Sequence, residues 1–531
     1  MRLPFRCCTR EAGSGLLISN RNISSQMLIN QSVLSSHHLR DALGKRTIVG
    51  GAIAVGAQLV RFALQVTGSA VLARLLEPSQ FGLVAMGGTV TAFIVVLTEL
   101  NVATAAVQQE ELDQNTASAL MWIAVGMGLL AFLLAAVAAP VSLWFFDDRR
   151  LPLVVLCLGL TAPIYAIGAL PTALLTRNMR WLDLQVASLG GLAISLVVAV
   201  IAAKLFAAGY WALIIQAWVT ALTTTVAAWI LCPWRPSLVK DWSAVRSSLK
   251  FGSHLTGAMI LNYFHQQLDN ILIGARWGSV ELGFYSRAYN LLMIPLNFLS
   301  GPLGSAMIPA LSRLHREPAK WREAYLDALS VITFVGAGMA GLLYGGASPI
   351  VDLVLGSQWQ PVKLIFSCLV LGMLASVPMS ATGWIYISTG RTDRMFYWSL
   401  IGVPIYVASF LIGLPYGAVG VALCYSMSRY VAFFPSMFMA IYRTNITIFD
   451  ILAVIAVPTF AAAAIGFMLA RAVADLSIAP ALAAVAVAGL LYVGVCALAV
   501  LRLPVYRRLR SRGLDILGGA SARLLRRGSP G

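Results

Sequence analysis

The sequence predicts an all-α protein that crosses a membrane about fourteen times, and three observations support this prediction. Long apolar stretches follow one another from about residue 48 to about residue 502. Each is long enough to cross a bilayer, since roughly 20 residues at 1.5 Å rise span about 30 Å of hydrocarbon. The composition agrees, because 59% of the residues are hydrophobic and 11% are charged, with a mean hydropathy of +0.81. Soluble domains do not carry apolar residues in such unbroken runs.

The spans can be placed in order from their apolar runs and from the polar or glycine-containing breaks between them. The shortest breaks, near Gly209 and Pro415, are where two helices are hardest to separate. Trp144 and Trp359 are among the aromatic residues near span ends, which suit either anchors at headgroup level or packing residues. The predicted spans are residues 48–75, 81–104, 118–144, 151–175, 182–206, 208–231, 251–274, 281–304, 324–345, 361–388, 394–413, 416–441, 447–471 and 479–502.

Positive charge is distributed unevenly between alternate loops. If the first helix runs outward, the loops on the side of the N-terminus carry more lysine and arginine than the opposite loops, and both tails add to that side. The positive-inside rule therefore places both termini in the cytoplasm, which an even number of spans allows. The net charge of +17 is largely this topology signal. We expect no nucleic-acid partner, since the sequence contains no compact basic domain.

The two ends of the chain differ from its apolar body. Residues 1–45 are polar and rich in Ser and Asn, without an apolar run long enough for a signal peptide, so we expect a disordered cytoplasmic tail. Translation from Met27 would remove more than half of this segment. Residues 506–531 form a basic cytoplasmic tail, which either lies against anionic lipid or is merely solvated.

Several kinds of chemistry have no matching motif in this sequence. The seven cysteines lack metal-ligand spacing and the five histidines form no metal-binding set, so we expect no metal and no cofactor. A phosphate-binding loop of the Gly-Lys-Ser type is missing, so ATP hydrolysis within the chain would not drive transport. A membrane enzyme usually carries a large external loop with catalytic groups. The longest external segment here, about residues 346–360, has only Asp352 as a charged residue, so we expect no enzyme.

An internal repeat divides the chain. Residues 73–82 and 275–283 both read Ala-Arg, then a short polar turn, then an apolar residue and Gly that open the next helix. The offset of six spans preserves topology, so we interpret the match as a parallel duplication, a common plan for transporters with a central cavity. The predicted units are an N-lobe of helices 1–6 (residues 46–246), a C-lobe of helices 7–12 (residues 247–442) and helices 13–14 (residues 443–505).

Polar side chains inside the spans are the candidate functional residues, because a charge at mid-bilayer costs on the order of 2.5–3.5 kcal/mol. Arg61 lies about midway along the first span, with Gln58 and Gln65 on the same helical face. Glu99 lies toward the inner end of the second span. In span seven, Asp269 shares a helical face with Asn262, His265 and Gln266.

Two more arginines, Arg287 in span eight and Arg429 in span twelve, give these intramembrane groups a positive excess. If all of them face one cavity, it is cationic and binds an anion, and arginine suits phosphate because its planar fork donates two parallel hydrogen bonds. The alternative is structural: an interhelical pair of Arg61 with Glu99, or snorkelling of Arg287 to the surface. His265 is either a polar residue of its face or a proton-coupled group.

Several motifs resemble those of the bacterial polysaccharide flippases, the Wzx-type and colanic-acid-type exporters of lipid-linked oligosaccharides in the multidrug/oligosaccharidyl-lipid/polysaccharide superfamily. They are residues 72–78 (Leu-Ala-Arg-Leu-Leu-Glu-Pro), 81–86 (Phe-Gly-Leu-Val-Ala-Met), 103–108 (Ala-Thr-Ala-Ala-Val-Gln), 268–274 (Leu-Asp-Asn-Ile-Leu-Ile-Gly) and 282–290 (Leu-Gly-Phe-Tyr-Ser-Arg-Ala-Tyr-Asn). The similarity runs from about residue 40 to about residue 440. Residues 99–101 (Glu-Leu-Asn) depart from the expected acid-Leu-Gly, which leaves the role of Glu99 open.

The resemblance implies fourteen helices that move an undecaprenyl-pyrophosphate-linked glycan from the inner to the outer leaflet of the bacterial inner membrane. Alternating access would serve exopolysaccharide or lipopolysaccharide assembly, driven by an H⁺ or Na⁺ gradient or by the membrane potential, with a glycan polymerase as partner. Helices 13 and 14 would pack against one lobe and border a groove for the lipid tail. The expected roles are substrate binding for Arg61, Arg287, Arg429, Gln58 and Gln65, and coupling or cavity tuning for Asp269, Glu99, His265 and Asn262.

The alternative function is a cation-coupled exporter of small drugs from the same superfamily. Such a protein would present an acidic, aromatic-lined cavity to a cationic cargo and would have twelve spans. The excess of arginine and the fourteen spans both count against it.

Overall fold

The structure of the chain is a computed structural model, and it describes residues 30, 34, 43–98, 106–107, 112–239, 246–474, 476–502 and 506. Within these residues every regular element is a helix, so the all-α prediction is confirmed. Glu99 and most of both tails lie outside the described residues.

The first part of the chain forms helices whose ends follow local sequence rules. Pro78 is the first residue of α3, a position where its missing N–H costs nothing. The Asp113 carboxylate caps α5 by accepting hydrogen bonds from the backbone N–H groups of Asn115 and Thr116. Gly209, at φ 55°, makes the short turn before the last helix of this part. The helices are α2 (Leu43–Leu75), α3 (Pro78–Thr98), α5 (Gln114–Phe145), α6 (Leu151–Gly159), α7 (Thr161–Arg177), α8 (Trp181–Leu205) and α9 (Trp211–Leu231).

The second part begins with one long helix that is broken at Gly278, whose φ of 78° lies outside the helical region. This break separates the two spans predicted on either side of residues 275–280. The helices are α10 (Arg246–Leu314), α11 (Pro318–Gly345), α12 (Ala347–Val354), α13 (Gln360–Ser380), α14 (Thr382–Ser388), α15 (Thr392–Gly413), α16 (Gly417–Ile441), α17 (Ile448–Val473) and α18 (Ile478–Arg502), with 3₁₀ turns at Ser357–Trp359 and Leu414–Tyr416.

Eleven segments of the described chain are long and apolar enough to cross a membrane. One of them joins α15 to α16 and so covers two predicted spans, while the seventh and eighth predicted spans lie in α10, which is not among the eleven. Large apolar side chains lie on the outer faces of the helices, such as Trp144 at 86% exposed and Phe460 at 75%. Such surfaces suit lipid rather than water. The chain is a multi-pass membrane protein.

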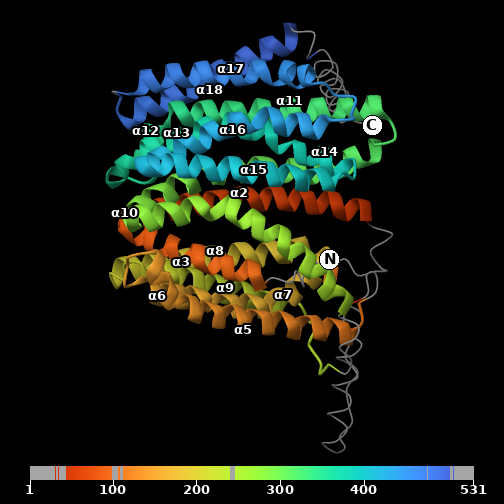
Figure 1. The fold of residues 1–531 in the computed structure, drawn as a ribbon, viewed down its shortest axis with the longest axis vertical. Helices are drawn as coiled ribbons and strands as arrows, with labels where there is room; N and C mark the ends of the chain where they lie inside the picture. Colours follow the sequence, from red (N-terminus) through yellow and green to blue (C-terminus); the bar gives the residue numbers. More distant parts are fainter. Residues whose placement is uncertain are drawn as a thin grey trace, which may run out of the picture.

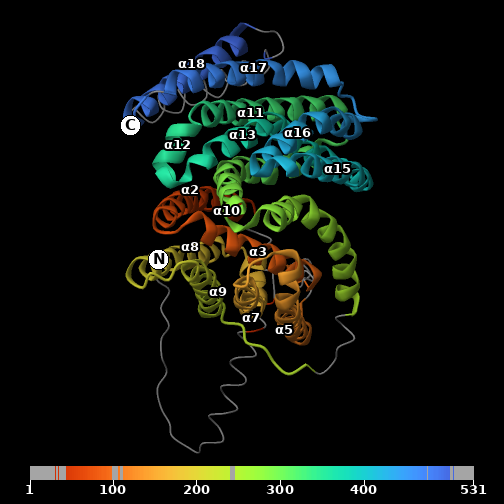
Figure 2. The same cartoon turned by 60° about the vertical axis from the view of Figure 1, so that its left-hand side comes forward.

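The helices form two groups that lie on either side of α2 and α10. Figure 1 shows α3 and α5–α9 on one side and α11–α18 on the other, and Figure 2 shows the same separation after a turn of the view. α10 packs against α3 in the first group and against α13, α15 and α16 in the second. α17 packs on α11, and α18 packs on both. The exact lobe boundaries predicted from the repeat stay a prediction.

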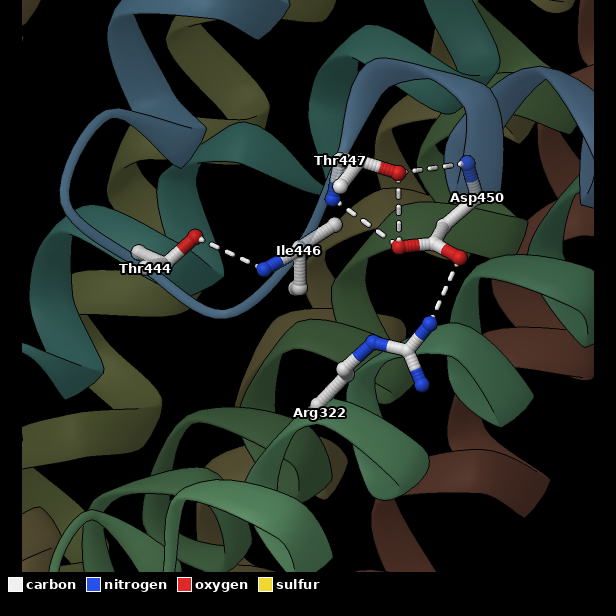
Figure 3. Close-up of polar contacts among 5 residues, drawn as sticks. All are labelled: Arg322, Thr444, Ile446, Thr447 and Asp450. Atoms are coloured by element: carbon white, nitrogen blue, oxygen red, sulfur yellow. Dashed lines mark hydrogen bonds and ion pairs between the residues drawn. The ribbon is translucent and has the colours of Figure 1, made fainter.

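α17 begins at an ion pair with α11. Figure 3 shows Nη2 of Arg322 donating to Oδ1 of Asp450 at 2.5 Å. The same carboxylate and the Thr447 hydroxyl form a reciprocal capping box at the first turn of α17. The preceding loop is held by the Thr444 hydroxyl, which accepts from the Ile446 N–H at 3.3 Å. These bonds fix the point at which the chain leaves the second group and enters the last helix pair.

The two groups meet where α3 crosses the second half of α10, which we call the α3–α10 crossing. A Cβ added to Gly82 would overlap the carbonyl oxygen of Ser279, and a Cβ added to Gly283 would overlap that of Pro78. Pro78 and Ser279 occupy equivalent places in the predicted repeat, as do Gly82 and Gly283. The contacts are therefore reciprocal, as expected for two halves related by an approximate two-fold axis.

A tryptophan from the α12–α13 connection packs between the two groups of helices beside the α3–α10 crossing. Trp359 is 0% exposed, and its Nε1 donates to the carbonyl oxygen of Ala73 at 2.8 Å. Its ring lies 5.4 Å from that of Phe81, edge to face. Nη2 of Arg74 donates to the carbonyl oxygen of Leu353 at 2.6 Å. Trp359 is thus a packing residue between the two groups, not an anchor at headgroup level.

Candidate functional site

Arg61 lies in a cavity within the first group of helices. α2 carries it against α8, where its Nη2 donates to the Ser188 hydroxyl at 2.6 Å. The cavity has a volume of about 370 Å³. It is lined by Arg61, Gln65, Tyr165, Thr172, Leu175, Leu184, Ala187, Ser188, Leu192, Thr220, Thr224 and Ala228, from α2, α7, α8 and α9. Arg61 is the only charged residue of this lining, counted over the part of the chain that the structure describes.

The surroundings of Arg61 leave part of its guanidinium available to a ligand. Nη2 donates to Ser188, Nη1 keeps its donors free of hydrogen bonds to described residues, and the buried Nε has no partner there either. No carboxylate lines the cavity as described, so its positive charge is not balanced there. The Thr172, Thr220 and Thr224 hydroxyls donate to backbone carbonyls of their own helices, and their oxygens keep lone pairs that accept hydrogen bonds. Such a lining suits an anionic group with hydroxyls attached.

Gln65 lines the cavity with Arg61, one turn farther along α2. Gln58 is half-buried, one turn before Arg61. The three residues are on one face of α2, as the sequence predicted. Of the two glutamines, Gln65 lines the Arg61 cavity described here and Gln58 does not.

A second cavity lies beside the first and is mostly apolar. Its volume is about 580 Å³, and helices α3, α5, α6 and α7 line it. Tyr165 of α7 lines both cavities, so the two spaces adjoin at this residue. Thr91 and Thr98 are among its few polar lining residues.

Asp269 and Arg429 share a buried cluster of tyrosines in the second group of helices. Asp269 is 3% exposed and accepts hydrogen bonds at 2.7 Å from the Tyr285 hydroxyl and from the Asn270 N–H. The Arg429 guanidinium lies 4.5 Å from the ring centre of Tyr406 and 4.6 Å from that of Tyr425, and it donates to both hydroxyls. The Tyr285 ring stacks on Tyr289 at 6.2 Å between ring centres, and no ion pair joins Asp269 to Arg429 among the described residues.

This tyrosine cluster differs from the Arg61 cavity in its charge balance. Asp269 supplies a carboxylate to this cluster without forming an ion pair with Arg429, and tyrosine rings and hydroxyls surround the guanidinium. The structure therefore brings Asp269 and Arg429 together in one environment and places Arg61 in another.

Arg287 lies at the α3–α10 crossing. Its guanidinium carbon is 4.1 Å from the ring centre of Phe81, a cation–π contact between the two groups of helices. Its Nε is buried and has no partner among the described residues. Three predicted site residues remain. Asn262 and His265 belong to α10, but the structure does not describe their side chains, and Glu99 lies outside the described residues.

Comparison with known proteins identifies the family. Residues 71–364, more than half of the chain, match the family described as "Polysaccharide biosynthesis protein". The chain belongs to this family. It is 24% identical over 413 residues to the lipopolysaccharide biosynthesis protein WzxC of Escherichia coli (strain K12), covering 75% of this chain and 82% of that protein. It is 24% identical over 340 residues to the succinoglycan biosynthesis transport protein ExoT of Rhizobium meliloti (strain 1021), covering 64% and 69%.

The fold of this polysaccharide biosynthesis protein is also similar to that of a solved flippase. The lipid II flippase MurJ, in an inward closed conformation, superposes with a TM-score of 0.66 at 12% identity. The match covers 86% of this chain and 100% of that chain. At this identity the likeness concerns the fold alone. The predicted family resemblance is confirmed by the family match and by the curated relatives.

Sequence reasoning predicted Arg61 and Gln65 of the Arg61 cavity and missed the residues that supply its hydroxyls, which are Tyr165, Thr172, Ser188, Thr220 and Thr224. Ser188 lies 127 residues from Arg61 in a span with many small residues, and no pattern singles it out. Tyr165 could have been predicted as a cavity residue from the sequence, because the hydroxyl of a tyrosine within an apolar span needs either a hydrogen-bond partner or a cavity.

A stability measurement can show whether Arg429 in the tyrosine cluster stabilises the fold or binds the cargo. Arg429→Leu should lower the free energy of unfolding by on the order of 2 kcal/mol, because it removes the cation–π contacts and the hydrogen bonds to Tyr406 and Tyr425. Arg429→Lys keeps the charge and should recover part of that loss. Thermal unfolding of the purified variants in detergent measures both. A single variant of unchanged stability that has lost transport would instead make Arg429 a cargo contact.

Proposed function

We propose that this protein flips an undecaprenyl-pyrophosphate-linked oligosaccharide from the inner to the outer leaflet of the bacterial inner membrane, without covalent chemistry. The observation that carries the proposal is the Arg61 cavity, where one unbalanced cation faces a lining of hydroxyls. Family membership supports it, since the curated relatives are named for lipopolysaccharide biosynthesis and succinoglycan transport.

Recognition in this proposal uses the charge of Arg61 and the hydroxyls around it. The guanidinium fork binds the pyrophosphate or an acidic sugar through charge-assisted hydrogen bonds. Thr172, Thr220 and Thr224 accept hydrogen bonds from sugar hydroxyls at the same time. A cationic drug would be repelled by the same cavity, which makes the drug-exporter alternative the weaker one.

Transport in this proposal proceeds by alternating access, with the α3–α10 crossing as the outer closure. The charge of the loops supports this orientation, since the loop between α2 and α3 is on the side opposite to both cytoplasmic termini. An H⁺ or Na⁺ gradient, or the membrane potential, supplies the energy. A glycan polymerase on the outer side receives the unit.

The deciding experiment is the leaflet distribution of lipid-linked oligosaccharide in membranes from a strain depleted of this protein. We expect complete units to accumulate on the cytoplasmic face and to return to the outer face when the wild-type protein is restored. A normal distribution with intact surface polymer would contradict the proposal. Drug hypersensitivity of the same strain would then support the small-molecule exporter.

A further inference from the structure

Three arginines gather where α16 ends beside the turn between α14 and α15. Arg391 donates through Nη1 to the carbonyl oxygen of Tyr442 at 2.7 Å and through Nη2 to that of Arg443 at 3.1 Å. Nη1 of Arg394 donates to the same Tyr442 oxygen at 3.2 Å. The guanidinium carbons of Arg394 and Arg443 lie 4.5 Å and 5.5 Å from the centre of the Tyr442 ring. We call Arg391, Arg394, Arg443 and Tyr442 the α16 arginine cluster.

Most of the charge in this cluster has no carboxylate partner among the residues that the structure describes. In the described part of the chain no carboxylate lies within ion-pair distance of the three arginines, and nearby Asp393 is exposed. Arg391 satisfies carbonyls at the C-terminal end of α16, which attract cations. Arg394 keeps Nε and Nη2 free of hydrogen bonds with described residues, and Arg443 contacts only the Tyr442 ring there.

The corresponding place in the first group of helices is different. Arg180 follows α7 and donates to the carbonyl oxygen of Leu231, the last residue of α9, at 2.8 Å. This contact is the counterpart of the Arg391 contact at the end of α16. Arg180, however, also pairs with the Asp183 carboxylate at 2.6 Å. Arg235 at the same end is also held by protein groups, since its Nη1 donates to the carbonyl oxygens of Cys232 and Trp234 at 2.8 Å and its guanidinium lies over the Trp229 ring. Carbonyls or a carboxylate therefore bind the arginines at the end of α9, whereas the Arg443 side chain at α16 has no such bond among the described residues.

The cluster stands at the border of the lipid-facing surface. Tyr442 is 45% exposed, and Phe438, one turn earlier on α16, is 65% exposed. On α15, Phe396 and Tyr397 are 49% and 55% exposed, within the first turn and a half of that helix. Since α15 and α16 each span the hydrocarbon, their ends reach headgroup level. Cations next to exposed aromatic side chains at this level face phospholipid headgroups on one side and acyl chains on the other.

We propose that the α16 arginine cluster binds the phosphate of an anionic phospholipid of the leaflet on the side of the chain termini. Arg394 and Arg443 donate to the phosphate oxygens, while Tyr442 holds both guanidiniums in place by cation–π contact. Phe438 and Phe396 pack against the first methylenes of the acyl chains. A phosphate on a lipid fits this site better than a soluble anion, because the exposed aromatic residues offer contacts only to a ligand with a tail.

The backbone at Arg443 offers a variant that removes the side chain without harming the fold. Arg443 has a φ of 58°, in the left-handed region that glycine adopts more easily than arginine. Arg443→Gly should therefore leave the thermal stability unchanged or raised while it weakens lipid binding. The Arg443 carbonyl that accepts from Arg391 remains in this variant.

The test measures binding of phosphatidylglycerol and phosphatidylcholine with identical chains to the purified full-length protein by native mass spectrometry. The wild type should prefer phosphatidylglycerol, and Arg394→Gln with Arg443→Gln should reduce that preference by about tenfold. Arg443→Gly alone should reduce it in part. The matched control is Arg313→Gln with Arg316→Gln, which removes two exposed charges near the end of α10 on the same side of the membrane and should leave the preference intact.

Three outcomes would overturn the proposal. One is equal binding of the two lipids by the wild type. Another is an equal loss in the Arg313→Gln, Arg316→Gln control, which would reduce the effect to net charge. The third is binding of soluble glycerol phosphate as tightly as phosphatidylglycerol, which would exclude a lipid as the specific occupant.

Discussion

Replacing Arg61 with alanine is expected to abolish surface glycan and to trap lipid-linked oligosaccharide on the cytoplasmic face, at unchanged protein level. Arg61 supplies the only charge described in its cavity, and only Nη2 has a protein partner among the described residues. A charge-assisted contact of this kind contributes about 3 kcal/mol, so its loss should slow flipping roughly a hundredfold. The protein itself should fold, because alanine leaves no unpaired charge behind.

Two further variants make this prediction specific. Arg61→Lys keeps the charge but loses the planar fork, and we expect partial activity. Ser188→Ala removes the described partner of Arg61 and keeps its charge, so activity should fall much less than in Arg61→Ala. The measurement is the leaflet distribution of the lipid-linked unit in a strain that carries each variant as its only copy. Normal export by Arg61→Ala would remove Arg61 from the mechanism and leave the family assignment untouched.

The sequence predicted the fold well because membrane spans depend on length and hydropathy, which are local properties. Pro78 and Gly278 also mark helix boundaries for local reasons, a missing N–H and a positive φ. The role of Trp359 was not predictable from its place near a span end. Its partner is the carbonyl of Ala73, 286 residues away, and only the packing of the two groups brings them together.

The candidate site was also predictable only in part, because the sequence shows which residues are charged but not how the helices pack. A charge in an apolar span stands out, so Arg61, Asp269 and Arg429 were all identified from the sequence. Which of them share an environment depends on helix packing. The structure places Arg429 and Asp269 among neighbouring tyrosines and leaves Arg61 without a carboxylate in its described cavity. A simple excess of arginine over acid could not distinguish these two situations.

Gly82→Val is expected to lose most transport activity, because it acts on the α3–α10 crossing and not on the cargo. The added side chain would overlap the backbone carbonyl of Ser279, which cannot rotate away as a side-chain end could. The closed crossing would be destabilised by about 3 kcal/mol or more, enough to shift a two-state equilibrium more than a hundredfold toward the state in which α3 and α10 are apart. A transporter that cannot close one side cannot complete its cycle.

The reciprocal geometry predicts that Gly283→Val has the same effect, since its side chain would overlap the carbonyl oxygen of Pro78. Gly301→Val, on the same helix α10, is the matched control, because no heavy atom described lies within 4 Å of the added Cβ. Labelling of a cysteine introduced at Ser79 by an impermeant reagent added from outside reports the opening. We expect faster labelling in both crossing variants and wild-type labelling in the control. Equal activity of all three variants would mean that the crossing does not close during transport and that another contact forms the outer closure.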